Sequence, residues 1–173
     1  FSLTAFDKGD YQKAVEQENL AKNLVEVLYP NDNHYAGKEL RLKQQYFFVS
    51  ATLQSIAAKH TELYGTMKNF HEKNVIQIND THPTMVIPEL IRLLTSEHGL
   101  EMDDAIDVVR RTCAYTNHTI LAEALEKWPA SYLEKVVPQL MPIIRELDKR
   151  VRRDFHDEKV YIIDEQERVH MAH

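Results

Sequence analysis

The stretch Val75-Ile76-Gln77-Ile78-Asn79-Asp80-Thr81-His82-Pro83 contains the clearest change of pattern in the chain. Residues 75–79 are short, β-branched and bounded by polar residues, which predicts a strand. An apolar-rich segment follows to about Thr95 and predicts a helix, with Pro88 in its first turn, where proline is tolerated. The polar residues 79–82 therefore lie where a buried strand gives way to a helix.

A second stretch repeats this arrangement further along the chain. Residues 112–115 predict another short strand, and the polar run Thr116-Asn117-His118-Thr119 follows it. Strands separated by helices imply a parallel sheet, and ligands of such sheets gather at the carboxyl ends of the strands. The polar runs 79–82 and 116–119 are therefore candidates for facing one cleft.

The rest of the chain has mainly helical patterns. Apolar residues at helical spacing predict a helix over 10–28, with Asp10 as its N-cap, and a longer helix after Gly37. The other predicted elements are helices over Asp103–Arg111, up to Trp128 and over Leu140–Val151, and a third strand at Val160–Ile163. The sequence predicts an α/β fold that is mostly helical, with a few short parallel strands.

The composition is that of a soluble globular domain, with 173 residues, 43% hydrophobic and 28% charged. The net charge of -6 argues against a nucleic-acid or anionic-membrane surface, since either needs a basic face. No apolar run approaches the roughly 20 residues of a membrane span. The single cysteine, Cys113, excludes an internal disulfide and fits a cytoplasmic location, and its apolar surroundings predict an inert thiol. Because the chain starts at Phe1 and stops just after a strand-like stretch, we expect a piece of a longer protein.

The side chains of the two polar runs suit a ligand rich in hydroxyl groups, such as a sugar. Asp, Asn and His donate and accept hydrogen bonds at fixed angles, and an unpaired buried polar group costs about 1–3 kcal/mol. The alternative is purely structural: Thr81 and Thr119 cap helices, while Asp80 and His118 satisfy backbone groups. The residues alone leave both possibilities open.

Two other kinds of site have weaker support. A structural zinc site needs four ligands, and the chain offers only pairs, Asp80 with His82 or His170 with His173. Glycoside hydrolysis needs two carboxyl groups at a set separation, which spacing in the sequence does not give. The candidate carboxylates are Asp32, Asp80 and Glu123.

The segment Tyr29-Pro30-Asn31-Asp32-Asn33 interrupts the helical pattern and predicts a loop. Proline, asparagine and aspartate favour a plain turn between two helices. The functional alternative is a mobile gate in which Tyr29 stacks on a sugar face while Asp32 and Asn33 reach its hydroxyl groups.

Several long motifs, in order along nearly the whole chain, resemble the α-glucan phosphorylases, the family of glycogen, starch and maltodextrin phosphorylase. The matching stretches are Val27–Asn33, Gly37–Gln44, Asn79–Pro83 with Ile87–Leu90, Tyr115–Thr119 and Glu123–Pro129. The resemblance implies that terminal α-1,4-linked glucose is cleaved with inorganic phosphate to give glucose 1-phosphate. It also implies the cofactor pyridoxal phosphate, whose phosphate group transfers the proton. The lysine that holds this cofactor in the family lies in a C-terminal domain, which residues 1–173 do not include.

In this interpretation residues 1–173 are an internal part of the N-terminal domain of a glycosyltransferase-B-type (GT-B) enzyme, inactive alone and cytoplasmic. The resemblance implies that Tyr29 stacks on the acceptor glucan and that His118 is the catalytic-site histidine at the glucose subsite. It further implies substrate contacts from Asp32, Asn33, Arg41, Asp80, His82 and Glu123. The Tyr11–Asn23 helix resembles the family's dimer contact, which implies a homodimer.

Two departures from the family pattern bear on regulation. His34 stands where regulated animal members carry an aromatic residue, and Ala36 replaces an acid, which favours an unregulated, bacterial-type enzyme. The rival hypotheses are a non-catalytic glucan-binding or dimerisation module and a purely structural helical domain.

Overall fold

The computed structural model describes residues 1–119, 121 and 125–171. The chain divides into two compact units, Phe1–Gln44 and Gln45–His173. The long helix α3, Tyr35–Tyr64, contributes residues to both units. It begins at Tyr35, two residues before Gly37, whereas the sequence predicted a start after Gly37.

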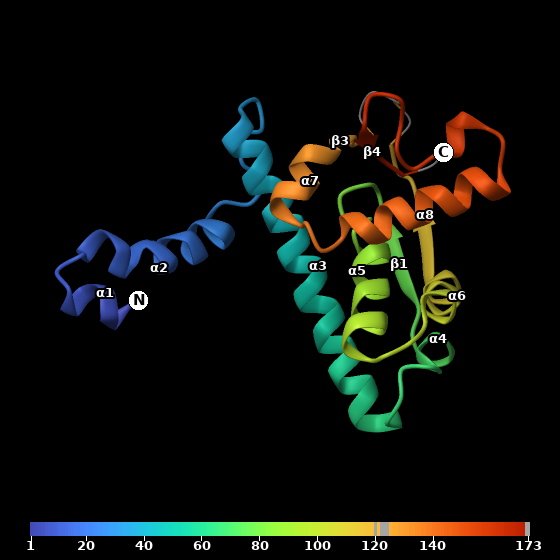
Figure 1. Ribbon diagram of the computed structural model, residues 1–173, viewed down its shortest axis with the longest axis horizontal. Helices are drawn as coiled ribbons and strands as arrows, with labels where there is room; N and C mark the ends of the chain where they lie inside the picture. Colours follow the sequence, from blue (N-terminus) through green and yellow to red (C-terminus); the bar gives the residue numbers. More distant parts are fainter. Residues whose placement is uncertain (120, 122–124, 172–173) are drawn as a thin grey trace. The chain divides into compact units, whose positions relative to one another are not determined.

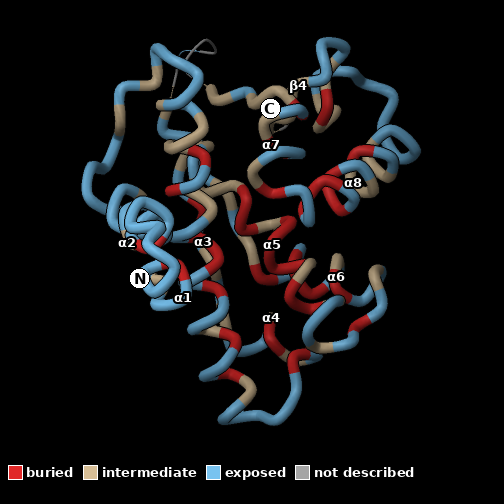
Figure 2. Tube along the Cα trace, turned by 60° about the vertical axis from the view of Figure 1, so that its left-hand side comes forward, coloured by how far each residue is buried: buried red, intermediate tan, exposed pale blue. Residues whose placement is uncertain are grey.

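The first unit contains α1, Leu3–Asp7, and α2, Tyr11–Glu26, before the first turns of α3. The predicted N-cap of α2 is confirmed, because the Asp10 carboxylate accepts the backbone N–H of Lys13 at 3.1 Å. α2 is exposed along most of its length, and Ala14 is its buried residue (Figure 2). The regularly spaced apolar residues of α2 therefore do not form a buried stripe within this unit.

The second unit is built on one parallel strand pair, as the sequence predicted. β1, Ile76–Asn79, pairs with β2, Cys113–Thr116, with Ile76 opposite Cys113 and Asn79 opposite Thr116. The crossover between them contains α5, Val86–Arg92, which continues as a π-helical turn over Leu93–Glu97, and then α6, Met102–Thr112.

The core of this unit surrounds α5, whose residues are mostly buried (Figures 1 and 2). α5 contacts α6 and also α8, Met141–Asp154, while the short α4, Phe70–Lys73, packs on α6. Pro88 lies in the first turn of α5, where the sequence predicted it. Val49, Leu53 and Ala57 of α3 are spaced so that they lie on one face of the helix, and all three are buried in the core.

The predicted third strand at Val160–Ile163 is wrong. A short 3₁₀ turn covers Glu158–Val160, and Ile163 forms only an isolated bridge with Val169. The Asp148 carboxylate on α8 accepts the backbone N–H groups of Ile162 and Ile163 at 2.9 and 3.0 Å. The backbone donors that a strand would direct to a neighbouring strand are thus satisfied by a helix side chain.

A different, antiparallel pair forms near the end of the described residues. β3, Trp128–Pro129, pairs with β4, Arg168–Val169, and α7, Ala130–Val136, follows β3 directly. Trp128 is thus in a strand, where the sequence predicted a helix. Across the described ranges, no helix combines the length and apolar character that crossing a bilayer requires.

Candidate functional site

The carboxyl ends of β1 and β2 lie side by side, so the two polar runs meet at one edge (Figure 1). Asn79 is in register with Thr116, and the backbone N–H of Asp80 donates to the Thr116 carbonyl at 2.8 Å. The predicted meeting of residues 79–82 and 116–119 is confirmed. These residues are called the strand-end cluster below.

Asp80 connects the two halves of the strand-end cluster. Its Oδ1 accepts the backbone N–H of His118 at 2.8 Å and lies 3.4 Å from the Thr119 hydroxyl. Its backbone has φ of 61°, in the left-handed region that aspartate tolerates better than most residues. The structural alternative for Asp80, that it satisfies backbone groups, is therefore confirmed.

Two imidazole rings of the strand-end cluster are exposed. His118 places Nε2 3.4 Å from Oδ1 of Asn79, which is a weak contact. Within the described part of the chain, His82 forms no hydrogen bond. Both rings therefore present nitrogen atoms that can donate to or accept from a hydroxyl group.

Tyr115 lies on β2 just before the polar run, and its buried hydroxyl group has no hydrogen-bond partner among the described residues. Burial raises its pKa, and the negative charge of Asp80 raises it further, so the phenol stays neutral at physiological pH. On the same strand, burial raises the pKa of the Cys113 thiol to about 11, which agrees with the predicted inert cysteine.

Thr81 does not cap α5, contrary to the structural alternative considered for it. Its hydroxyl accepts the backbone N–H of Glu126 at 3.4 Å, while the Glu126 carboxylate accepts the Gln45 amide at 3.2 Å. α5 starts five residues later, at Val86, after a turn in which Thr84 donates to the Thr81 carbonyl. Thr81 thus connects the strand-end cluster to the segment around Glu126.

The remaining predicted ligand-binding residues lie in the first unit, apart from one. Tyr29 is 79% exposed and has φ of 53°. Asp32 forms an ion pair with Arg41 at 2.7 Å, so each of these side chains already has an internal partner. The backbone N–H of Asn33 donates to the Asn31 side chain at 3.0 Å, while Glu123 lies outside the described residues.

Three contacts within the first unit fix the segment 27–33 on the start of α3. Besides the Asp32 pair, the Gln44 amide donates to the Val27 carbonyl at 2.6 Å. The Asn31 carbonyl sits directly over Gly37, where any β-carbon would come within 2.9 Å of the Asn31 carbonyl carbon. This loop, for which the sequence left open a plain turn or a mobile gate, thus packs against the start of α3, and Gly37 leaves the space for this contact.

A fully buried carboxylate, missed by sequence reasoning, anchors α5. Glu89 accepts two hydrogen bonds from Arg92, at 2.7 and 2.8 Å, and one each from the Tyr46 and Ser50 hydroxyls, at 3.0 and 2.8 Å. The only signal in the sequence was an acid inside an otherwise apolar helix. Through this network α5, which follows residues 79–83, is fixed to α3 within the second unit.

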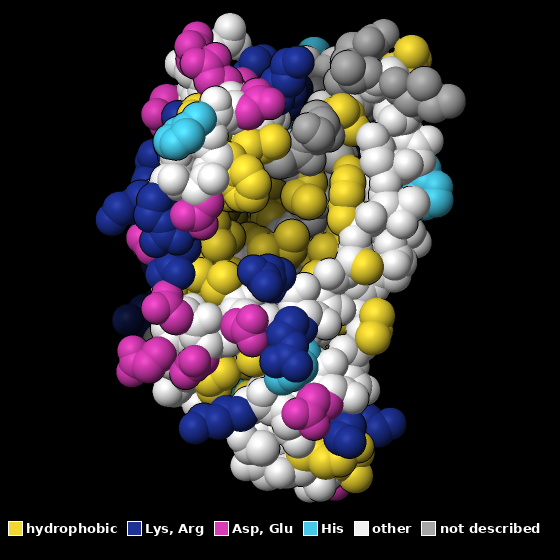
Figure 3. Space-filling view, turned by 90° about the vertical axis from the view of Figure 1, so that its right-hand side faces the viewer, with side chains coloured by type: hydrophobic (Ala, Val, Ile, Leu, Met, Phe, Trp, Pro, Cys, Tyr) yellow, Lys and Arg dark blue, Asp and Glu magenta, His cyan; other side chains and the backbone are white. Residues whose placement is uncertain are grey.

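An apolar cavity of about 280 Å³ adjoins Thr81. Hydrophobic side chains also gather in a hollow in the space-filling view (Figure 3). Side chains lining the cavity include Met85, Pro88, Trp128, Leu133, Ile144, Leu147, Val151 and Ile162. Such a lining suits apolar packing, whereas the strand-end cluster carries the groups that pair with hydroxyls. In the ranges that the structure covers, no three His, Cys, Asp or Glu side chains gather as metal ligands would.

A parallel strand pair with hydrogen-bonding side chains at its carboxyl ends defines an α/β unit with a candidate site for a hydroxyl-rich ligand. Residues 1–173 match the carbohydrate phosphorylase family, and the chain belongs to that family. The resemblance found in the sequence motifs is thereby confirmed.

Individual relatives agree with this membership. The chain is 50% identical over 175 residues to a maltodextrin phosphorylase of Streptococcus pneumoniae, with 100% of the chain and 23% of the relative covered. It is 50% identical to glycogen phosphorylase 2 of Dictyostelium discoideum, covering 87% of the chain and 15% of the relative. The human brain form of glycogen phosphorylase is 48% identical to the chain, and the match covers 87% of the chain and 19% of the relative. The chain therefore spans about a fifth of the length of the curated relatives it matches.

Proposed function

We propose that the chain is the sugar-facing part of the N-terminal domain of a larger α-glucan phosphorylase of GT-B type. The complete enzyme would cleave terminal α-1,4-linked glucose with inorganic phosphate and release glucose 1-phosphate. The observation that carries the proposal is the meeting of residues 79–82 and 116–119 at one strand edge, in a member of the carbohydrate phosphorylase family.

The exposed groups of the strand-end cluster supply the sugar contacts in this proposal. His118 binds the glucose to be transferred, and His82 with Asp80 faces the acceptor side of the glucan. Imidazole nitrogens both donate and accept, so each ring can pair with a sugar hydroxyl. A site built this way discriminates strongly, because a ligand without the hydroxyl leaves the polar partner unpaired.

The loop 29–33 supplies the remaining contacts in this proposal. The exposed ring of Tyr29 stacks on the acceptor glucan, and Asn33 reaches the glucose. Asp32 acts with Arg41, because their ion pair of 2.7 Å holds both side chains in one position. Glu123 stays a proposed contact on the strength of the family resemblance.

The residues of the strand-end cluster do not fit the cofactor itself. Residues 79–83 and 116–119 contain no lysine to carry pyridoxal phosphate and no arginine to pair with its phosphate group. We therefore assign pyridoxal phosphate to the complete enzyme, held mainly by the C-terminal domain that the family resemblance implies. The contribution of this chain is to bind and orient the sugar.

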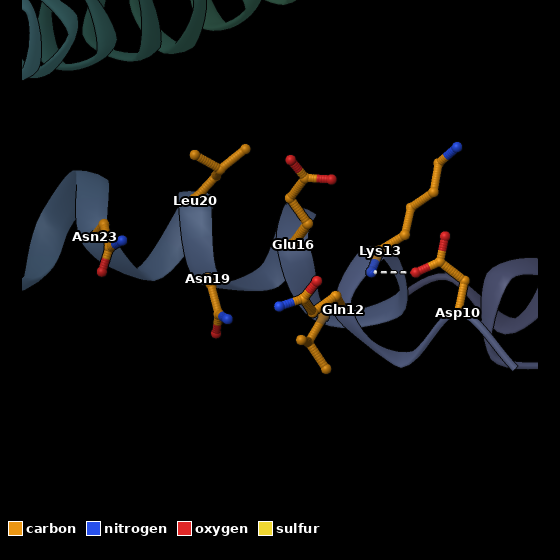
Figure 4. Close-up of a pocket in the computed structure, with 8 residues that line it drawn as sticks. Asp10, Gln12, Lys13, Glu16, Asn19, Leu20 and Asn23 are labelled. Carbon is orange, nitrogen blue, oxygen red and sulfur yellow. Dashed lines mark hydrogen bonds between the residues drawn. The ribbon is translucent and has the colours of Figure 1, made fainter.

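The complete enzyme is proposed to be a cytoplasmic homodimer that uses α2. Most of this helix is exposed, including Tyr11 at 63% and Leu20 at 60%. A shallow hollow runs along α2 from Asp10 to Asn23, and Leu20 and Glu16 project to one side of the helix while Asn19 projects to the other (Figure 4). α2 contacts α1 in its own unit but leaves apolar side chains such as Leu20 exposed, and an exposed apolar face of this kind is a suitable contact for a second copy. The single cysteine fits the reducing cytoplasm.

The apolar cavity next to Thr81 supports the proposal of a larger enzyme. An apolar cavity that opens to the surface is suited to being covered by further protein. Because the chain spans about a fifth of its relatives, the rest of the same polypeptide is the proposed cover.

A product assay tests the proposal. The complete protein and the 173-residue chain are each incubated with maltodextrin, inorganic phosphate and pyridoxal phosphate, and glucose 1-phosphate is measured. We expect product from the complete protein and none from the chain alone. Maltodextrin binding by the complete protein without any product would instead favour a non-catalytic glucan-binding module.

A further inference from the structure

Asp80 joins both halves of the strand-end cluster through its backbone and through its side chain. Its backbone N–H donates to Thr116 of β2, and its Oδ1 accepts the backbone N–H of His118. These two hydrogen bonds, both 2.8 Å long, fix residues 116–118 at their start and at their end. The chain bends around the Asp80 carboxylate.

The geometry at this position needs a side-chain oxygen that accepts the His118 N–H. A carboxylate accepting a backbone N–H forms a charge-assisted hydrogen bond, which is stronger than one between neutral groups. The second donor, the Thr119 hydroxyl, lies 3.4 Å from the same oxygen. The φ of 61° at Asp80 aims the side chain across the strand edge and is tolerated by aspartate, asparagine and glycine.

His118 itself has little else to hold it. It is exposed, and among the described residues its ring makes one hydrogen-bond contact, at 3.4 Å with Asn79. The position of its imidazole therefore depends on the backbone that Asp80 fixes. A group that must meet a hydroxyl within hydrogen-bond distance loses its effect when it is displaced by about 1 Å.

We propose that Asp80 serves the site chiefly as a positioning residue, which holds the His118 backbone and thereby aims the His118 imidazole at the sugar. This inference rests on the proposed function for the identity of the ligand. It leaves the main sugar contacts with His118 and His82, and it assigns to Asp80 the turn between Thr116 and Thr119 as its larger contribution, beside the acceptor-side contact proposed above.

Two substitutions separate positioning from direct contact in the complete protein. Asp80→Asn keeps an oxygen that accepts the His118 N–H, whereas Asp80→Gly removes it, and both residues accept a positive φ. We expect Asp80→Gly to lower kcat/KM for maltodextrin at least roughly 10-fold and Asp80→Asn by less than roughly 3-fold. Asp157→Gly is the matched control, because the exposed Asp157 carboxylate also accepts a backbone N–H, from Lys159 at 3.0 Å.

A double-mutant cycle with His118→Ala gives a readout that a merely structural role would not move. If Asp80 acts through His118, the Asp80→Gly substitution should lower kcat/KM by less than roughly 3-fold when it is made in the His118→Ala variant. The positioning role is overturned if Asp80→Gly keeps its full effect without the imidazole, or if Asp80→Asn is as damaging as Asp80→Gly. The first result would mean that Asp80 acts independently of His118, and the second that the site needs the negative charge of Asp80.

Amide hydrogen exchange tests the same role independently of catalysis. In the complete protein, the His118 N–H should exchange at least roughly 10-fold faster in Asp80→Gly than in the wild type, and Asp80→Asn should remain close to wild type. Equal exchange in all three chains would overturn the inference. A wild-type protein that makes no glucose 1-phosphate would contradict the proposed function alone, since this exchange measurement does not depend on it.

Discussion

Single side chains direct the backbone at several places in this chain. Asp80 holds the turn that carries His118, and Asp148 takes the backbone donors of Ile162 and Ile163. At Gly37 the absence of a side chain has the same kind of effect, because the Asn31 carbonyl occupies the space of a β-carbon. In each case one position decides where several neighbouring backbone atoms lie.

Substituting Gly37 by alanine tests the seat of the loop 29–33. In an open helix this change stabilises by about 0.5–1 kcal/mol. Here the new β-carbon would come within 2.9 Å of the Asn31 carbonyl carbon and 3.2 Å of Cα of Asp32, and backbone cannot rotate away as a side chain can. We expect the clash to prevail, with a net destabilisation of roughly 1–3 kcal/mol in urea unfolding and faster amide hydrogen exchange at residues 31–33.

The control for this prediction is Lys38→Ala. Lys38 is the next residue of the same helix, and its side chain is exposed. This substitution should leave amide hydrogen exchange at residues 31–33 unchanged. A Gly37→Ala chain that exchanges as slowly and is as stable as the wild type would show that the loop does not pack on Gly37.

At the level of helices and strands, the second unit depends on how α5 is anchored. The helix follows residues 79–83, and its Glu89 side chain is completely buried among Arg92, Tyr46 and Ser50. Burial raises the pKa of Tyr46, which stays a neutral donor to the carboxylate. A displaced α5 would carry the strand-end cluster with it, so this network supports the site without touching it.

Removal of the buried carboxylate should be costly. Glu89→Ala leaves the largely buried Arg92 without its main partner and strands two hydroxyl donors, so we expect a loss of about 3 kcal/mol in the free energy of unfolding. Urea unfolding measures it. Glu97→Ala is the matched control, since Glu97 pairs with the same arginine at 3.4 Å but is 50% exposed, and should cost less than about 1 kcal/mol. Equal losses in the two variants would contradict an anchoring role for Glu89.

The same level shows what could and could not be predicted from the sequence. The strands β1 and β2 were predictable, because short β-branched runs bounded by polar residues leave few alternatives, and their parallel pairing followed from the helices between them. Val160–Ile163 has the same composition but forms no strand, because composition does not tell where backbone donors find acceptors. The acceptor is the Asp148 carboxylate, twelve residues before Val160, and the composition of the segment does not indicate this contact.

On the scale of the whole molecule, the motifs predicted the family, and the family membership is confirmed. The meeting of residues 79–82 with 116–119 was also predictable from strand order alone. The roles of Gly37, Glu89 and Thr81 were not, since each depends on a contact distant in sequence or on the shape of a turn. Assignments to Tyr29, Asp32, Asn33 and Arg41 remain proposals based on the resemblance.

The proposed dimer contact can be tested on the complete protein. Leu20→Glu places a charge on an exposed apolar position of α2 and should weaken self-association at least roughly 10-fold, as measured by sedimentation. Lys22→Gln is the control, because Lys22 pairs only with Glu18 on the exposed surface of the same helix. Unchanged association of the Leu20→Glu variant would exclude α2 as the contact.

The most direct test of the central claim, that the strand-end cluster contacts the sugar, compares three histidines in the complete protein. Glucose 1-phosphate formation from maltodextrin and inorganic phosphate is measured for His118→Ala, His82→Ala and His156→Ala, the last being an exposed histidine after α8. We expect kcat/KM to fall at least roughly 10-fold for His118→Ala and for His82→Ala, since each removes a hydrogen bond to the sugar, and to stay unchanged for His156→Ala. Wild-type rates for both His118→Ala and His82→Ala would contradict the account.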